Sequence, residues 1–140
     1  MGKAIKAGRV VVILAGKYAG KKAVIMNINE EGTDKHKFPH AVVVGVEKAP
    51  RRVTRAMNEK KVQKKTHAKV FTKVINLQHF MPTRYNVDYK FESIPTDPKE
   101  KKTLLKKYAK TFQESYIRQG ELASEKTKTG VAYLFKKLYF

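Results

Sequence analysis

Short apolar runs rich in β-branched residues, separated by polar segments, make up much of the first part of the chain. Each run is shorter than a typical helix, and the runs cover residues 10–14, 23–28, 41–47 and 70–76. Residues 86–91 are a candidate fifth strand. Short strands joined by loops predict a small closed or nearly closed β-barrel, since closure removes exposed sheet edges. We expect this barrel to end near residue 92.

A basic loop containing glycines lies between the first two apolar runs. Gly16 and Gly20 allow the positive φ that such a loop needs, and Lys17, Lys21 and Lys22 accompany them. Small residues and ammonium groups close to the backbone favour phosphate binding. The nucleotide-binding phosphate loop is excluded, because its spacing between glycines differs and because it requires Ser or Thr after its lysine. The loop therefore predicts contact with a polyanion.

Helical spacing replaces the strand pattern after residue 96. Asp97 is placed to cap a helix that begins at Pro98, with Glu100 completing the start signal. We expect this amphipathic helix to run to about residue 119, with Gly120 as its C-terminal cap. The lysines of this helix are free to contact phosphate. The helix also has an apolar stripe that should pack on protein, formed by Leu105, Tyr108, Phe112 and Tyr116.

The C-terminal segment is polar up to Gly130 and then rich in aromatic residues. Tyr133, Phe135, Tyr139 and Phe140 would form a poorly tolerated exposed apolar patch. They are therefore expected to dock on the chain's own barrel, on a neighbouring protein or against RNA bases. The pattern divides the chain into a β-barrel over 1–92 and a helical extension with an aromatic tail over 93–140, which makes it mainly β with an α extension.

Charge narrows the range of possible partners. The chain of 140 residues has 31 Lys and Arg against 12 Asp and Glu, for a formal net charge of +19. A charge this large opposes compaction unless a large anionic partner neutralises it. The chain has no Cys, which excludes disulfides and thiolate zinc sites and fits a reducing compartment. Neither a transmembrane segment nor a signal-peptide pattern is present, so the cytosol or nucleus is expected.

A basic insertion at about 51–67 separates the third and fourth runs. Its apolar residues are too sparse to anchor a core element, and a brief helix fits the pattern. A solvated charged loop is the simple interpretation, but the scarcity of acids favours nucleic-acid contact. The candidate RNA-binding residues of the whole chain are Arg9, Lys17, Tyr18, Gly20, Lys21, Lys22, Arg51, Arg52, Arg55, Lys60, Lys61, Lys64, Lys65, Lys69, Arg84 and Tyr85.

Arg84 and Tyr85 admit two interpretations. Pro82 stiffens the approach to Arg84, whose guanidinium can clamp a phosphate while the Tyr85 ring stacks on a base. Alternatively, Tyr85 belongs to the barrel core and Arg84 forms an internal ion pair. The local sequence leaves both open.

Two segments resemble known families. Residues 8–25 closely resemble the KOW motif of ribosomal proteins and transcription elongation factors, with Gly20 at its characteristic glycine. Residues 71–85 look like the signature of the eukaryotic ribosomal protein L27e family, most sharply at Met81-Pro82-Thr83-Arg84-Tyr85. This resemblance covers essentially the whole chain, including the ending Phe135-Lys136-Lys137-Leu138-Tyr139-Phe140.

The resemblance to the L27e family implies a fold and a function. The expected fold is a small SH3-like barrel with a helical C-terminal extension. The expected function is that of a structural constituent of the large (60S) subunit of the cytosolic ribosome, which binds large-subunit ribosomal RNA and neighbouring ribosomal proteins. It implies passage through the nucleus and nucleolus during subunit assembly, and no catalysis by this chain.

The sequence supports three other functions less well. The polar residues Glu30, Glu31, Asp34, His36 and His40 could imitate a metal or acid–base site, but Pro39 disfavours a helical histidine pair and no nucleophile motif accompanies them. We therefore expect no enzyme, metal, cofactor or small-molecule substrate. A KOW-domain transcription elongation or RNA-processing factor outside the ribosome is the main alternative, although the spread of cations better suits wrapping in folded RNA. A membrane-surface role for the 97–119 helix lacks any supporting anchor.

Overall fold

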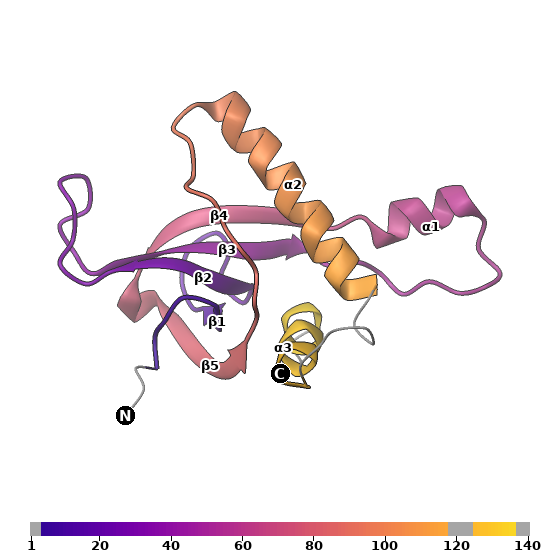
Figure 1. Cartoon of the computed structure of the whole chain (residues 1–140), viewed down its shortest axis with the longest axis horizontal. Coiled ribbons are helices and arrows are strands. Elements are labelled where there is room, and N and C mark those ends of the chain that lie inside the picture. The colour runs from indigo at the N-terminus through magenta and orange to yellow at the C-terminus, as the bar shows by residue number, and fades with distance from the viewer. Residues whose placement is uncertain (1–3, 118–124, 137–140) are drawn as a thin grey trace.

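The computed structural model describes residues 4–117 and 125–136. The element order is β1 (Arg9–Ile13), β2 (Lys22–Asn29), β3 (His40–Lys48), α1 (Glu59–Thr66), β4 (Lys69–Asn76), the 3₁₀ turn η1 (Leu77–His79), β5 (Phe80–Asn86), α2 (Pro98–Ile117) and α3 (Glu125–Phe135). The described part of the chain is therefore mainly β, with helices added between β3 and β4 and after β5 (Figure 1).

The strands form one five-stranded antiparallel sheet in the order β4-β3-β2-β1-β5. Strands β4 and β5 are its two edges, so the sheet formed by the described residues is not closed. The runs predicted a closed or nearly closed barrel, and the closed form is wrong. The turn η1 carries the chain from one edge to the other, and the Asn76 side chain caps it by accepting from Gln78 N at 3.0 Å. Figure 1 shows β5 swung beneath the other strands.

The first four predicted strands are confirmed to within a few residues, whereas the fifth is wrong. Strand β5 covers Phe80–Asn86 and not residues 86–91. Pro82 pairs with Val11 in this strand. Proline has no N–H group to donate, and an edge strand tolerates it because one side of the strand has no neighbour to which an N–H must donate. Residues 87–97 instead form an irregular connection in which Tyr89 and Phe91 pack toward α2.

Successive side chains along each strand point to opposite faces of the sheet, so the core is divided between the two faces. On one face Val10, Val24 and Val44 pack against α2 and α3. On the other face every strand contributes to a second buried cluster, whose members are Val11, Ile13, Ala23, Ile25, Ala41, Val43, Phe71, Ile75 and Phe80. The sheet must therefore curve around this second cluster.

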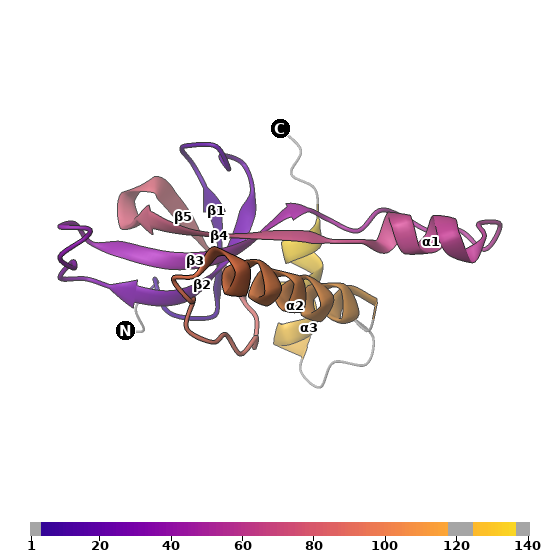
Figure 2. The same cartoon turned by 90° about the horizontal axis from the view of Figure 1, so that it is seen from above.

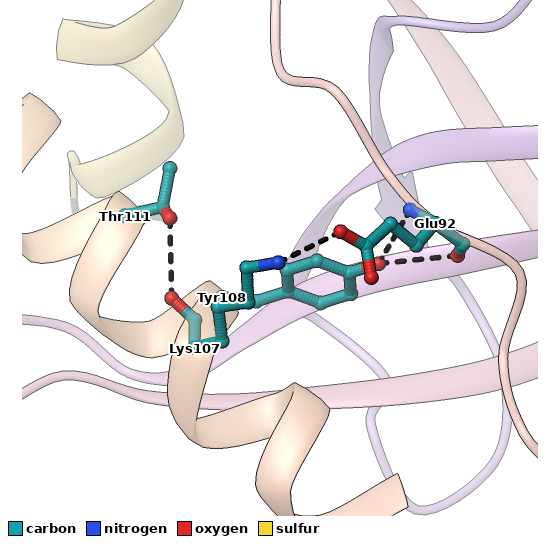
Figure 3. Close-up of polar contacts among 4 residues, drawn as sticks. All are labelled: Glu92, Lys107, Tyr108 and Thr111. Carbon is teal, nitrogen blue, oxygen red and sulfur yellow. Dashed lines mark hydrogen bonds and ion pairs between the residues drawn. The ribbon is translucent and has the colours of Figure 1, made fainter.

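Helix α2 begins as the sequence predicts, with Asp97 Oδ1 accepting from Lys99 N at 3.0 Å. Its apolar stripe is buried, since Tyr108 is 3% exposed and Phe112 is fully buried. The predicted cap Gly120 lies outside the described residues. Figure 3 shows how α2 holds the preceding connection: the Tyr108 hydroxyl accepts from Glu92 N at 2.7 Å and donates to Glu92 O at 3.1 Å, and the Lys107 ammonium lies 2.7 Å from Glu92 Oε1.

The described part of the aromatic tail docks on the chain's own β-sheet, which is one of the three expected solutions. Helix α3 packs its buried Val131, Leu134 and Phe135 into the core shared with α2. Gly130 lies so close to Asn86 O that a Cβ atom could not be accommodated there. Tyr139 and Phe140 lie outside the described residues.

The basic insertion forms a projecting arm, which we define as residues 51–67. Figures 1 and 2 both show α1 extending beyond the sheet at the far end of β3 and β4. No residue of α1 is buried, so polar contacts hold it. Asn58 Oδ1 accepts from Lys61 N at 3.0 Å, Arg51 N donates to Lys65 O at 2.7 Å, and a side chain of α2 donates to Thr66 Oγ1 at 3.2 Å. The arm is therefore helical without contributing to the core.

Candidate nucleic-acid interface

The glycine-containing loop between β1 and β2 has the backbone geometry that its sequence predicts. Gly16 and Gly20 have φ values of +92° and +82°, which side-chain-bearing residues rarely adopt. Gly20 N donates to Ile13 O at 2.7 Å. Lys17 and Lys21 are exposed at the loop, and the Lys21 ammonium donates to Glu47 O at 3.1 Å.

Tyr18 holds this loop against the sheet. Its ring stacks on the ring of Phe71 with centroids 3.8 Å apart and an interplanar angle of 4°. The ammonium groups of Lys17 and Lys73 lie 5.5 and 5.9 Å from the Tyr18 ring centre, within the range of cation–π attraction. Lys73, which the sequence did not single out, thereby adds a cation to the loop from the middle of β4.

Lys22 has a different environment from the other loop lysines. It is only 5% exposed, and its ammonium donates to the main-chain oxygens of Tyr133 at 2.7 Å and Lys136 at 2.5 Å. It also lies 3.9 Å from the Tyr133 ring centre. Burial, and secondarily the charge of Lys136, lower the pKa of Lys22 to about 8. Lys22 thus caps the C-terminal end of α3, where unpaired carbonyls favour a cation.

The arm presents a dense group of exposed cations. Lys65 is half-buried, and the exposed members are Arg51, Arg52, Arg55, Lys60, Lys61 and Lys64. The only acid in α1 is Glu59, in its first turn. At the base of the arm the Lys69 ammonium pairs with Glu47 Oε1 at 3.5 Å. Figure 2 shows the arm extending away from the sheet, and its exposed cations therefore lie beyond the sheet.

Strand β5 contains a bulge opposite β1 that positions Arg84 and Tyr85. Arg9 pairs with Asn86 and Val11 with Pro82, so β5 has two more residues than β1 between these pairs. The bulge is held by Thr83, whose hydroxyl donates to Val10 O at 2.6 Å and whose carbonyl accepts from Arg9 Nη1 at 3.0 Å. Bulges redirect side chains in this way beside many functional sites.

At this bulge Arg84 lies beside Tyr85. Arg84 Nη2 donates to the Tyr85 hydroxyl at 3.1 Å, and the guanidinium carbon lies 5.0 Å from the Tyr85 ring centre. That hydrogen bond is the main cause that raises the pKa of Arg84. The Tyr85 ring also stacks on Tyr133 of α3, with centroids 4.2 Å apart. Together with Lys22 beneath Tyr133, these side chains form a cation–ring–ring–cation series, which we call the Arg84–Lys22 column.

The structure thus distributes the predicted site residues over separate places. Arg9, Arg84 and Tyr85 come together on β1 and β5. The glycine loop faces the base of the arm across a pocket that Lys21, Glu47 and Pro50 line together with Lys136, another cation that the sequence did not single out. The remaining predicted cations belong to the arm itself, except Lys69, which is the first residue of β4.

The acidic and histidine-bearing loop after β2 contains no metal site within the described residues. No group of potential ligands suitable for a metal ion occurs in residues 4–117 and 125–136. The rings of His36 and His40 instead pack edge-on at 5.4 Å and surround Phe38. None of the helices in these residues is long and apolar enough to cross a membrane.

These features define a basic, mainly β protein with a surface charge typical of nucleic-acid-binding proteins. The chain belongs to the ribosomal L27e protein family, whose sequence model matches residues 10–138. It is similar to the large ribosomal subunit protein eL27 of Candida albicans, at 41% identity over the full length of both chains, and to that of Tetrahymena thermophila, at 40% over the full length of both. The Caenorhabditis elegans protein of that name is 40% identical over 83% of this chain and 90% of its own.

Proposed function

We propose that this chain is a structural constituent of the large subunit of the cytosolic ribosome, where it binds and stabilises ribosomal RNA. The observation that carries the proposal is the arm, whose exposed cations project from the sheet with a single acid in α1. Phosphates of folded RNA neutralise such a surface and relieve the self-repulsion of a chain with net charge +19. The names of the relatives, large ribosomal subunit proteins, support the same assignment.

We further propose that the curved sheet is an SH3-like KOW barrel. The supporting features are the position of β1 between β2 and β5, the turn η1 between β4 and β5, and a core to which all five strands contribute. In this proposal residues 1–92 form the barrel domain with the arm as its insertion, and residues 93–140 form the helical extension. Helices α2 and α3 then cover the outer face of the barrel.

The proposed RNA contacts are the exposed cations of the loop, arm and bulge. Tyr18, Gly20, Lys22 and Tyr85 shape or hold these surfaces, and Arg9 fastens the bulge. Large-subunit RNA and adjacent ribosomal proteins are the proposed partners, with passage through the nucleus and nucleolus during assembly. The role proposed for the chain is structural and includes no catalytic step.

The experiment is sucrose-gradient sedimentation of cell lysate, with the chain detected in each fraction at moderate and at high salt. Co-sedimentation with the large subunit and with whole ribosomes that persists at high salt is the expected result, because buried contacts are screened less than exposed ones. Recovery near the top of the gradient at both salt concentrations contradicts the proposal and favours a KOW factor that acts outside the ribosome.

A further inference from the structure

The bulge in β5 changes which side chain is available to RNA at this edge of the sheet. In a regular strand Arg84 and Tyr85 would point to opposite faces. The two additional residues that β5 has opposite β1 break this alternation, and Arg84 Nη2 reaches the hydroxyl of its sequence neighbour. The hydrogen bonds of Thr83 to Val10 and Arg9 make the bulge a fixed part of the fold.

The ring of Tyr85 is already engaged by other side chains. It is half-buried, and it stacks on Tyr133 at 4.2 Å with an interplanar angle of 18°. Arg84 lies on it as well, with the guanidinium carbon 5.0 Å from the ring centre. A nucleobase could stack on Tyr85 only by displacing one of these partners.

Arg84, in contrast, is exposed and held in place. Its side chain ends in a planar group, and its bond to the Tyr85 hydroxyl restricts that group before any partner binds. The Tyr85 ring is itself held through Tyr133 and Lys22, which anchor it to α3 and β2. Guanidinium planes are among the surfaces on which unpaired RNA bases stack, and pre-ordering lowers the entropic cost of such a contact.

We propose that Arg84 stacks on an unpaired RNA base, and that Tyr85 and the rest of the Arg84–Lys22 column serve as its support. The inference rests on the proposed function, because it requires RNA as the partner, and it adds a specific contact to one site. The alternative is a phosphate clamp, in which the Arg84 charge matters and its planar shape does not.

The test compares the purified full-length chain with the variants Arg84→Lys and Arg84→Ala. The probes are a single-stranded oligoadenylate and an abasic ribose-phosphate strand of equal length, measured by fluorescence anisotropy over a range of salt concentrations. Lysine preserves the positive charge but lacks the planar guanidinium group. Stacking predicts that Arg84→Lys loses about tenfold in affinity for oligoadenylate, within the range for one stacked base, and little for the abasic strand. The slope of affinity against salt should not change, because the number of phosphate contacts is the same.

The control is Arg55→Lys, which changes an exposed arginine of the arm and should leave the preference for oligoadenylate unchanged. Tyr85→Phe, which removes only the hydroxyl that holds Arg84, should weaken oligoadenylate binding by a smaller factor, and circular dichroism verifies that each variant is folded. If Arg84→Lys keeps the wild-type preference for oligoadenylate, the stacking inference is overturned and the phosphate clamp is favoured. If the wild-type chain binds neither probe and does not co-sediment with ribosomes, the proposed function itself fails, and the inference fails with it.

Discussion

The ammonium of Lys22 on β2 donates to the main-chain oxygen of Tyr133, 111 residues further along the chain, and also lies 3.9 Å from the ring of that residue. This contact joins the start of the second strand to the last helix that the structure describes. It removes one predicted phosphate ligand from the exposed surface and makes it a structural cation.

The first prediction is that Lys22→Met destabilises the fold. Methionine retains most of the apolar chain but leaves the carbonyls of Tyr133 and Lys136 without the donor that they now share. Unpaired buried polar groups cost about 1–3 kcal/mol, so the free energy of unfolding in urea should fall by about that amount. The exposed Lys17→Met is the matched control and should change it little; equal stability of both variants would argue against the capping role.

The second prediction concerns the pH dependence of stability through Lys22. Its pKa is lowered from 10.5 to about 8 in the folded chain, so between these pH values the unfolded chain retains a proton that the folded chain releases. Linkage then makes the unfolding free energy increase as pH rises through this window, and below about pH 8 both states are protonated and the contribution is constant. Urea denaturation at several pH values should show the advantage of wild type over Lys22→Met growing from pH 8 to 10.5. A constant difference would mean that Lys22 stays protonated in the folded chain.

The third prediction is that Gly45→Val is strongly destabilising. A Cβ atom at Gly45 would lie 2.6 Å from Cε1 of Phe71, which is shorter than real contacts allow, and Phe71 also supports Tyr18 of the glycine loop. Overpacking of this kind costs about 1–3 kcal/mol. Thermal unfolding should show a loss for Gly45→Val that comes from packing, whereas any loss for Gly20→Ala, whose Cβ meets nothing within 4 Å, comes only from the strain of a positive φ. An unchanged melting temperature for Gly45→Val would contradict the contact between Gly45 and Phe71.

The fourth prediction is that the arm affects RNA binding and not stability. The triple variant Lys60→Glu, Lys61→Glu, Lys64→Glu changes exposed residues of a helix that buries nothing. It should lower affinity for large-subunit ribosomal RNA and reduce the salt slope by about one unit for each lost phosphate contact, with an unchanged melting temperature. Lys99→Glu, Lys101→Glu, Lys102→Glu in α2 gives the same change in net charge. If both triple variants bind equally weakly, total charge and not the arm determines affinity.

The fifth prediction separates the two contacts of Glu92 with α2. Tyr108→Phe removes the hydroxyl that bonds both the N–H and the C=O of Glu92 and should cost about 1–2 kcal/mol of unfolding free energy. Glu92→Gln removes only the exposed pair with Lys107 (Figure 3), and such surface pairs contribute little. Urea denaturation of the two variants gives the comparison, and a larger loss for Glu92→Gln would reverse this ranking.

The sequence predicts the strands whose own residue types are typical of strands, which are β1 to β4. Strands β1 to β4 are rich in β-branched and apolar residues, which are enriched in strands, so the sequence alone predicts them. Strand β5 was missed because Pro82 and the polar residues around it look like a turn, and only its position at the edge of the sheet explains them. The expected strand at 86–91 contains alternate apolar residues for another reason, since Tyr89 and Phe91 pack toward a helix.

The candidate site was predictable as charge and not as geometry. The arm and the glycine loop are visible in the sequence because lysine, arginine and glycine mark them locally. The burial of Lys22 depends on a helix 111 residues away, and the occupied ring of Tyr85 depends on that same helix. Long-range contacts of this kind leave no local signal, so the choice between surface and support roles required the fold.

The way in which α1 is held has a consequence for how the chain can change in evolution. Its hydrogen bonds are local, or close the arm at its base between Arg51 and Lys65, or tie its last residue Thr66 to Gln113 of α2 at 3.2 Å. None of its side chains enters either core. Substitutions, and even insertions, beyond that closure leave the β3–β4 register untouched. Selection can therefore remodel the reach and charge of this appendage while the scaffold beneath it remains constant.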